Sequence, residues 1–109
     1  MFKKLTLYRL QQIENMLKDE PNDSFLNYAL ALEYLKVNEL KKAIEIIEAL
    51  LKKDESYLGA YYQLGKLYEE TKQTDNAIAI YKKGITIAKQ QNNKKAVSEL
   101  NQALLLLED

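Results

Sequence analysis

Residues 62–70 read YQLGKLYEE and place a glycine, Gly65, in the middle of a helical pattern. Tyr61, Leu64 and Tyr68 recur at intervals of three and four residues, which is the spacing of one face of an α-helix. A glycine inside a helix costs about 1 kcal/mol relative to alanine, because its flexible backbone loses more entropy on folding. The pattern therefore predicts that Gly65 is kept for close packing.

The same apolar spacing continues along the chain and predicts an all-α protein. Asn-Gly and Asp-Gly turns, which are typical of β-hairpins, do not occur in the sequence. Short polar joints favour antiparallel packing of consecutive helices. The joint at residues 21–24 supplies oxygen atoms that can cap a helix, and Thr74 or Asp75 is expected to cap a later one. Six helices are expected, over residues 3–19, 23–37, 39–53, 56–72, 74–89 and 93–107.

The composition is that of one globular domain without a surplus of either charge. The 109 residues are 47% hydrophobic and 29% charged, with 16 Lys and Arg against 16 Asp and Glu. Zero net charge argues against a nucleic-acid partner, because such proteins normally carry a positive surplus. No stretch approaches the roughly 18 consecutive apolar residues of a membrane span, so we predict no membrane partner and a cytoplasmic location by default.

The residue types argue against an enzyme. The chain has no cysteine and no histidine, which excludes disulfides, thiolate nucleophiles, histidine bases and the usual zinc sites. Glu69 and Glu70 are adjacent in a predicted helix, so their side chains point in different directions. The three glycines are too scattered for a phosphate-binding loop. We therefore predict no catalytic, cofactor-binding or metal-binding residue.

A comparison of the chain with itself reveals a repeat when Tyr28 is aligned with Tyr62. The matching residues lie on the inward stripes of two consecutive predicted helices, and Ala31 falls on Gly65. The identical pairs are Tyr28 and Tyr62, Leu30 and Leu64, Tyr34 and Tyr68, Ala43 and Ala77, Ile44 and Ile78, and Ile46 and Ile80. A period of about 34 residues with a helix–turn–helix unit indicates a stacked helical repeat.

This unit resembles the tetratricopeptide repeat, most clearly over residues 57–88. Asn27 and Leu50 depart from the family pattern in the first copy. The residues that match its signature are Leu30, Ala31, Tyr34 and Ala43 in the first copy and Leu64, Gly65, Tyr68, Ala77, Tyr81 and Gly84 in the second. The resemblance implies antiparallel hairpins stacked as a short right-handed solenoid. It divides a single domain, residues 1–109, into an incomplete repeat (1–20), two full repeats (21–54 and 55–88) and a closing helix (89–109).

Small residues have a physical part in this pattern. One small residue on each helix of a hairpin lets the two axes approach closely, so Gly65 is expected to oppose Ala77 and Ala31 to oppose Ala43. The alternative is that Gly65 is a tolerated surface glycine. If Gly65 serves close approach, Gly65→Ala should be neutral or slightly stabilising, and Gly65→Leu should cost about 2 kcal/mol or more by overpacking.

The resemblance also implies a binding surface for a protein or peptide partner, because the first helix of each pair lines a concave groove in this family. Tyrosines suit such a surface, since they combine rigid area with a hydroxyl group. The candidate groove residues are Phe25, Tyr28, Leu32, Leu35, Tyr62, Lys66 and Glu69. The alternative is that they contact a neighbouring helix and belong to the core.

The C-terminal residues suggest a different use of apolar surface. Residues 104–107 are four consecutive leucines, which wrap about a full helical turn, so one side of the helix cannot bury them all. Leu105 and Leu106 are candidates for self-association into a homodimer, and the face of the first helix with Phe2, Leu5 and Tyr8 could also contact another copy. The main hypothesis is a protein-interaction module, and the alternative is a structural self-assembling unit.

Overall fold

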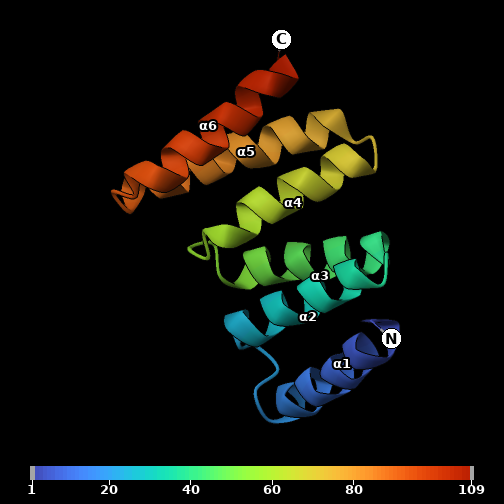
Figure 1. Cartoon of the computed structure of the whole chain (residues 1–109). Coiled ribbons are helices and arrows are strands. Elements are labelled where there is room, and N and C mark those ends of the chain that lie inside the picture. The colour runs from blue at the N-terminus through green and yellow to red at the C-terminus, as the bar shows by residue number, and fades with distance from the viewer. Residues whose placement is uncertain (1, 109) are drawn as a thin grey trace. The chain divides into compact units, whose positions relative to one another are not determined.

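The computed structural model describes residues 2–108, with side chains from residue 4, and within this range the chain is helical throughout, with short joints (Figure 1). The predicted all-α class is confirmed. The helices are α1 (Phe2–Asp19), α2 (Ser24–Lys36), α3 (Leu40–Lys53), α4 (Gly59–Glu70), α5 (Thr74–Gln90) and α6 (Lys94–Glu108). The largest difference from the predicted bounds is at α4, which begins at residue 59 rather than 56.

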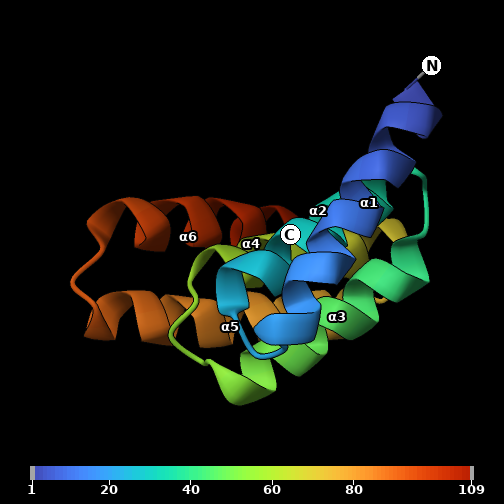
Figure 2. The same ribbon diagram turned by 90° about the horizontal axis from the view of Figure 1, so that it is seen from below.

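The helices form two compact units, residues 1–54 and 55–109. In the first unit α2 packs against both α1 and α3, and in the second unit α5 packs against both α4 and α6. Figure 2 shows α5 and α6 side by side and antiparallel, joined by a short connection. The predicted division of these units into repeats at residues 21–54 and 55–88 stays a prediction.

The small residues of the signature lie in the core of each unit. Ala31 and Ala43 are buried in the first unit, and Gly65, Ala77 and Gly84 are buried in the second. The larger signature residues are also buried, except Tyr34, which is half-buried; they are Leu30, Leu64, Tyr68 and Tyr81. Gly65 is therefore a core residue and not a surface glycine.

The neighbour of Gly65 differs from the expected one. A Cβ atom built on Gly65 would lie 2.1 Å from Cε1 and 2.4 Å from Cζ of Tyr81, so the closest group is the Tyr81 ring and not Ala77. Gly84 has the equivalent role on α5, since a Cβ atom built on it would lie 2.8 Å from Cβ of Tyr61. Each glycine thus makes room for a tyrosine of the facing helix. The expectation that Gly65→Ala is neutral or slightly stabilising is therefore wrong.

Side-chain caps fix the start of two helices. Oδ1 of Asp23 accepts a hydrogen bond of 2.8 Å from the backbone N–H of Leu26 at the start of α2, as the sequence predicted for this joint. Oδ1 of Asn93 accepts one of 3.0 Å from the N–H of Ala96 at the start of α6. Thr74 and Asp75 do not cap α5, because α5 begins at Thr74 itself and the flanking residue is Gln73.

The ends of α2, α4 and α5 share one turn geometry. Two residues after each helix, the chain takes a left-handed conformation, with φ of 61° at Asn38, 63° at Lys72 and 56° at Asn92. In each turn the next residue donates its N–H back to the last turn of the helix, as Gln73 does to the carbonyl of Tyr68 at 2.7 Å. This is the Schellman arrangement, which satisfies the last carbonyls of a helix and reverses the chain.

Lys72 has the least suitable side chain of the three, because lysine has no short polar group to offset the left-handed conformation. Lys72→Gly is expected to raise the free energy of unfolding by about 0.5–1 kcal/mol, since glycine adopts this conformation without the steric cost. Urea denaturation measures the change. Glu45→Gly, at an exposed site inside α3, is the control and should lower stability by about 1 kcal/mol. A Lys72→Gly variant that is less stable than wild type would contradict the steric argument.

Candidate functional site

The predicted surface residues of the first unit lie on one side of α2. Phe25 is the most exposed of them at 68%, and Tyr28, Leu32 and Leu35 are half-buried. Their spacing of three, four and three residues puts them on one face of the helix. The face is therefore partly packed and partly open, with the phenyl ring of Phe25 as its main exposed apolar group.

The second unit has a cleft between α4 and α6. Its volume is about 230 Å³. Tyr62 lines it from α4 and is 39% exposed, while Ala96 and Glu99 line it from α6. The full lining consists of Leu58, Gly59, Tyr62, Asn93, Ala96, Glu99 and Leu100. Gly59 and Ala96 have little or no side chain, which leaves space beside the Tyr62 ring.

Charged and aromatic groups hold Tyr62 in place. The Tyr62 and Tyr81 rings are tilted at 47° with their centroids 6.4 Å apart, a favourable aromatic geometry. Nζ of Lys66 lies 5.4 Å from the centroid of the Tyr62 ring, within the range of a cation–π interaction. The result is a preorganised aromatic surface with a positive charge beside it.

Glu69 interacts with two side chains of the second unit. Its Oε2 atom accepts a hydrogen bond of 2.5 Å from the hydroxyl group of Tyr81 and lies 3.9 Å from Nζ of Lys66. Burial, and then the hydrogen bond to the Glu69 carboxylate, raise the pKa of Tyr81 far above its ordinary value. Glu69, which the sequence placed in the groove, therefore orients Tyr81 and Lys66.

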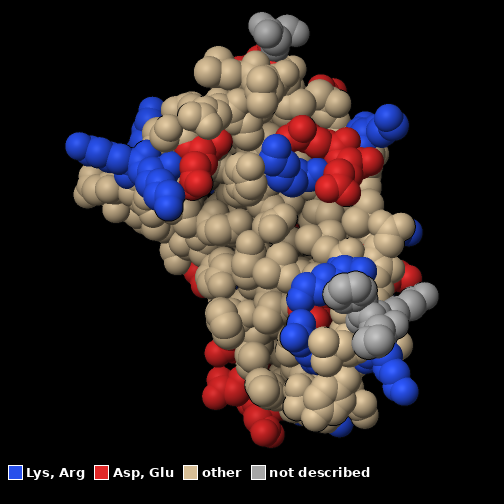
Figure 3. Space-filling view, in the orientation of Figure 1, with Lys and Arg blue, Asp and Glu red and all other residues tan. Residues whose placement is uncertain are grey.

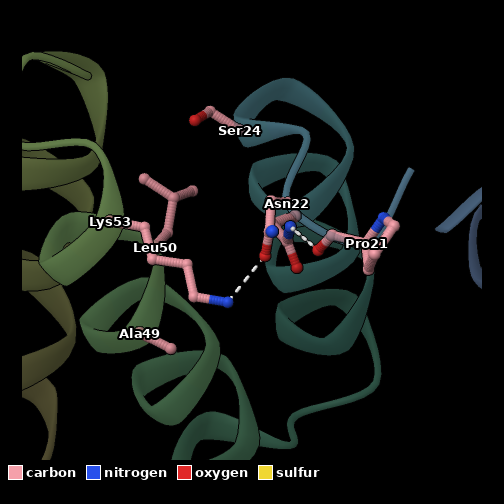
Figure 4. Close-up of a pocket in the computed structure, with 7 residues that line it drawn as sticks. Pro21, Asn22, Ser24, Ala49, Leu50 and Lys53 are labelled. Carbon is pink, nitrogen blue, oxygen red and sulfur yellow. Dashed lines mark hydrogen bonds between the residues drawn. The ribbon is translucent and has the colours of Figure 1, made fainter.

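A smaller hollow of about 50 Å³ in the first unit lies where the joint before α2 meets the end of α3 (Figure 4). Nζ of Lys53 donates a 2.6 Å hydrogen bond to Oδ1 of Asn22, and Nδ2 of Asn27 donates one of 3.1 Å to the carbonyl of Pro21. The hollow has space for water molecules only. Its polar groups fasten the joint before α2 to the end of α3.

Metal-binding clusters, membrane-spanning helices and surface charge are the remaining features that could indicate a function. Among the described residues no cluster of three or more acidic side chains could hold a metal ion. The helices within residues 2–108 are too short or too polar to cross a bilayer. On the face shown in Figure 3, basic and acidic side chains lie next to each other in several places, and one acidic group at the lower left has no basic neighbour in this view.

The terminal helices expose apolar side chains. On α6, Leu105 is 67% and Leu106 is 78% exposed, whereas Leu104 is buried. On α1, Leu5 and Tyr8 are at least half open to solvent. Leu7 and Met16 are exposed as well. The side chain of Phe2, which the sequence grouped with Leu5 and Tyr8, lies outside the described residues.

Sequence reasoning identified one wall of the cleft and missed the other. It selected Tyr62 on α4 but named none of the α6 residues that line the cleft, which are Ala96, Glu99 and Leu100. The repeat period could have found them, because a shift by one repeat places Ala96 at the position of Tyr62. The family signature is lost in α6, where Ser98 and Glu99 replace the Leu-Gly pair, and the weak signature hid the wall.

Comparisons with known proteins agree on one family. The model of the tetratricopeptide repeat matches residues 58–91. The solution structure of a tetratricopeptide repeat domain protein from Salinibacter ruber has 44% identity to the chain and a TM-score of 0.78, and the match covers 81% of this chain and 89% of that one. The crystal structure of the Salinibacter ruber domain protein gives 44% identity and a TM-score of 0.75, with coverage of 79% and 97%.

A more distant structure has a similar fold. The TPR2B domain of yeast Sti1, solved in a complex with pHsp70, has a TM-score of 0.86 at 19% identity, and the match covers 97% of this chain and 85% of that one. At this identity the likeness concerns the fold alone. A search of curated protein sequences found no match to the chain.

Proposed function

Because the chain belongs to the tetratricopeptide repeat family, we propose that it is a non-catalytic protein-interaction module that binds a peptide or helix of a partner protein. The proposed contact surfaces are the cleft between α4 and α6 in the second unit and the exposed face of α2 in the first. The TPR2B domain of yeast Sti1, which shares the fold, was solved with a bound partner, pHsp70.

The cleft beside Tyr62 is the observation that carries this proposal. At about 230 Å³ it is smaller than the roughly 300–1,000 Å³ of typical small-molecule sites, and it suits a side chain of a partner segment. Tyr62 offers a rigid aromatic surface that is already held by the Tyr81 ring and by Lys66. Such preorganised aromatic residues contribute a large share of the energy in protein interfaces.

A selected peptide tests the proposal. Peptides that bind the wild-type protein can be isolated from a displayed random library, and their affinity can be measured by fluorescence anisotropy. Tyr62→Ala is expected to weaken peptide binding at least tenfold, which corresponds to about 1.4 kcal/mol. Phe25→Ala should lower the affinity for any peptide that also contacts α2. Tyr8→Ala on α1 is a matched exposed control and should leave affinity unchanged. Peptides that bind equally well to Tyr62→Ala would contradict the proposed cleft.

Self-association through α6 is a second candidate function, and it is supported by the exposure of Leu105 and Leu106. Adjacent exposed leucines at a helix end mark an interaction site more often than single exposed apolar residues do. We expect the sedimentation-derived mass to rise to at least twice that of the monomer as concentration rises into the high micromolar range, and Leu105→Lys or Leu106→Lys to abolish the rise. A wild-type protein that stays monomeric at several hundred micromolar would rule this function out.

A further inference from the structure

The outer face of α6 corresponds to the face with which α4 contacts α5. A shift by one repeat relates α4 to α6 and places Lys95, Ser98, Glu99 and Gln102 at the positions of Tyr61, Leu64, Gly65 and Tyr68. The α4 residues are buried, and Gly65 and Tyr61 lie against α5. Their counterparts in α6 are exposed. Helix α6 therefore exposes to solvent the face with which the first helix of a repeat contacts the second helix of that repeat.

The outer face of α1 corresponds to the other half of a hairpin. The same shift places Arg9, Ile13 and Met16 at the positions that Ala43, Ile47 and Leu50 hold in α3. The three α3 residues are buried, whereas Arg9 and Met16 are exposed and Ile13 is half-buried. Helix α1 therefore exposes the face with which the second helix of a repeat contacts the first helix of that repeat. Leu5 and Tyr8 extend this exposed surface toward the start of α1.

The charges on the two helices are arranged in a complementary order. Helix α1 has Lys4 and Arg9 in its first half, and its second half has Glu14 and Asp19 with Lys18 between them, so the second half has one net negative charge. Helix α6 has Lys95 near its start and Glu108 at its end. In an antiparallel pair, the basic start of α1 lies beside the acidic end of α6, and the acidic end of α1 lies beside the basic start of α6. A parallel pair would bring the basic starts of the two helices together and would place the net negative second half of α1 beside Glu108.

We propose that α6 of one copy packs antiparallel against α1 of a second copy and completes a hairpin between the two chains. This inference rests on the proposed self-association and names the surface that receives α6. Leu105 and Leu106 then lie beside Leu5 and Tyr8, so the apolar residues at the end of one helix meet those at the start of the other. The contact is heterologous, because the two copies contribute different surfaces.

The residues at the centre of this pair set its strength. In the second unit, Gly65 faces Tyr81 and Tyr61 faces Gly84. The equivalent contacts between two copies are Glu99 with Ile13 and Lys95 with Met16. Arg9 precedes Ile13 by one turn, so its positive charge lies within about one helical turn of the Glu99 carboxylate across the contact. The long side chains hold the axes further apart than glycine does, and the association is therefore weaker and more reversible than a hairpin within the chain.

Mixing two blocked variants tests the heterologous contact. The first variant, Leu5→Lys with Tyr8→Lys, blocks α1 and leaves α6 intact. The second, Leu105→Lys with Leu106→Lys, blocks α6 and leaves α1 intact. All four residues are exposed, and circular dichroism checks that both variants keep their helices. Each variant alone is expected to be a monomer by sedimentation, and an equimolar mixture is expected to form a complex of two chains and nothing larger.

The mixing result separates this inference from self-association in general. If the variant blocked at α1 still associates alone while the variant blocked at α6 does not, self-association through α6 stands and the pairing with α1 is overturned. If the mixture stays monomeric while the wild-type protein associates, the pairing is also overturned. A wild-type protein that remains monomeric at several hundred micromolar overturns both proposals and leaves the outer faces to other partners.

Charge reversal provides an independent test that does not touch the leucines. Arg9→Glu and Glu99→Arg are each expected to raise the dissociation constant about tenfold, because each places two like charges together across the contact. A mixture of Arg9→Glu and Glu99→Arg chains contains the opposite-charge pair again and is expected to associate better than either variant alone. Equal association of the mixture and of the single variants would exclude the contact between Arg9 and Glu99.

Discussion

Gly65→Ala is expected to lower the free energy of unfolding by about 2–3 kcal/mol, although alanine is the better helix former. The new methyl group would lie 2.1 Å from Cε1 of Tyr81, far inside van der Waals contact. The Tyr81 ring cannot move aside at low cost, because it is buried and its hydroxyl group is bound to Glu69 at 2.5 Å. Overpacking therefore outweighs the gain of about 1 kcal/mol in helix propensity.

Two further variants isolate the cause of this loss. Gly59→Ala replaces an exposed glycine at the start of the same helix, so it should be neutral or stabilising by up to about 1 kcal/mol. In a Gly65→Ala and Tyr81→Leu double variant, the smaller side chain makes room for the methyl group. The two losses should then be less than additive by at least about 1 kcal/mol in a double-mutant cycle. Strictly additive losses in thermal and urea unfolding would show that the methyl group does not meet Tyr81.

The helices could be predicted from the sequence because each contains its own apolar spacing. The start of α4 could not, since the apolar residues Tyr57 and Leu58 continue the helical spacing into the joint. In the structure, the N–H groups of Ala60 and Tyr61 bind the carbonyls of residues 57 and 58, three residues back rather than four. The chain is therefore in a tighter turn there, and α4 begins later than the apolar spacing indicates.

Asn27 shows where the family signature and the local chemistry diverge. It stands at the position that Tyr61 occupies in the second copy, and the sequence offered no reason for the change. The structure supplies one, because Nδ2 of Asn27 donates hydrogen bonds of 3.1 Å to the carbonyl of Pro21 and 2.9 Å to that of Asp23. Both residues thus bond to the carbonyl six residues back in the preceding joint, Tyr61 to that of Glu55, but Tyr61 also fills the core, whereas Asn27 is half-buried.

Glu33 is another residue whose burial differs from what its residue type predicts. A glutamate in a helix is expected to face solvent, yet Glu33 is buried and its Oε1 atom has no hydrogen-bond partner among the described residues. Lys36 satisfies only the other oxygen, at 2.8 Å. The repeat register held the signal, because a shift by one repeat places Glu33 at the position of the buried Leu67. Side-chain pairing, as between Glu69 and Tyr81, left no comparable signal in the sequence.

Tyr61→Ala is expected to cost about 3–5 kcal/mol, the range for removing a fully buried aromatic side chain. The Tyr61 side chain is fully buried, and its Cβ atom occupies the space that the missing side chain of Gly84 leaves open. Its hydroxyl group donates a 2.8 Å hydrogen bond to the carbonyl of Glu55, whose carboxylate lies 2.9 Å from Nζ of Lys83. Truncation removes the ring from between α4 and α5 and also releases the joint before α4.

Tyr61→Phe separates the two contributions, because it keeps the ring and removes only the hydrogen bond. It should cost about 0.5–1.5 kcal/mol, so most of the loss in Tyr61→Ala is assigned to packing. Tyr8→Ala, which truncates an exposed tyrosine, should change stability by less than about 0.5 kcal/mol. Because small domains have only about 5–15 kcal/mol of stability, Tyr61→Ala should also show a broadened or early unfolding transition. Equal losses in Tyr61→Ala and Tyr61→Phe would place the energy in the hydrogen bond and contradict the packing of tyrosine against glycine between α4 and α5.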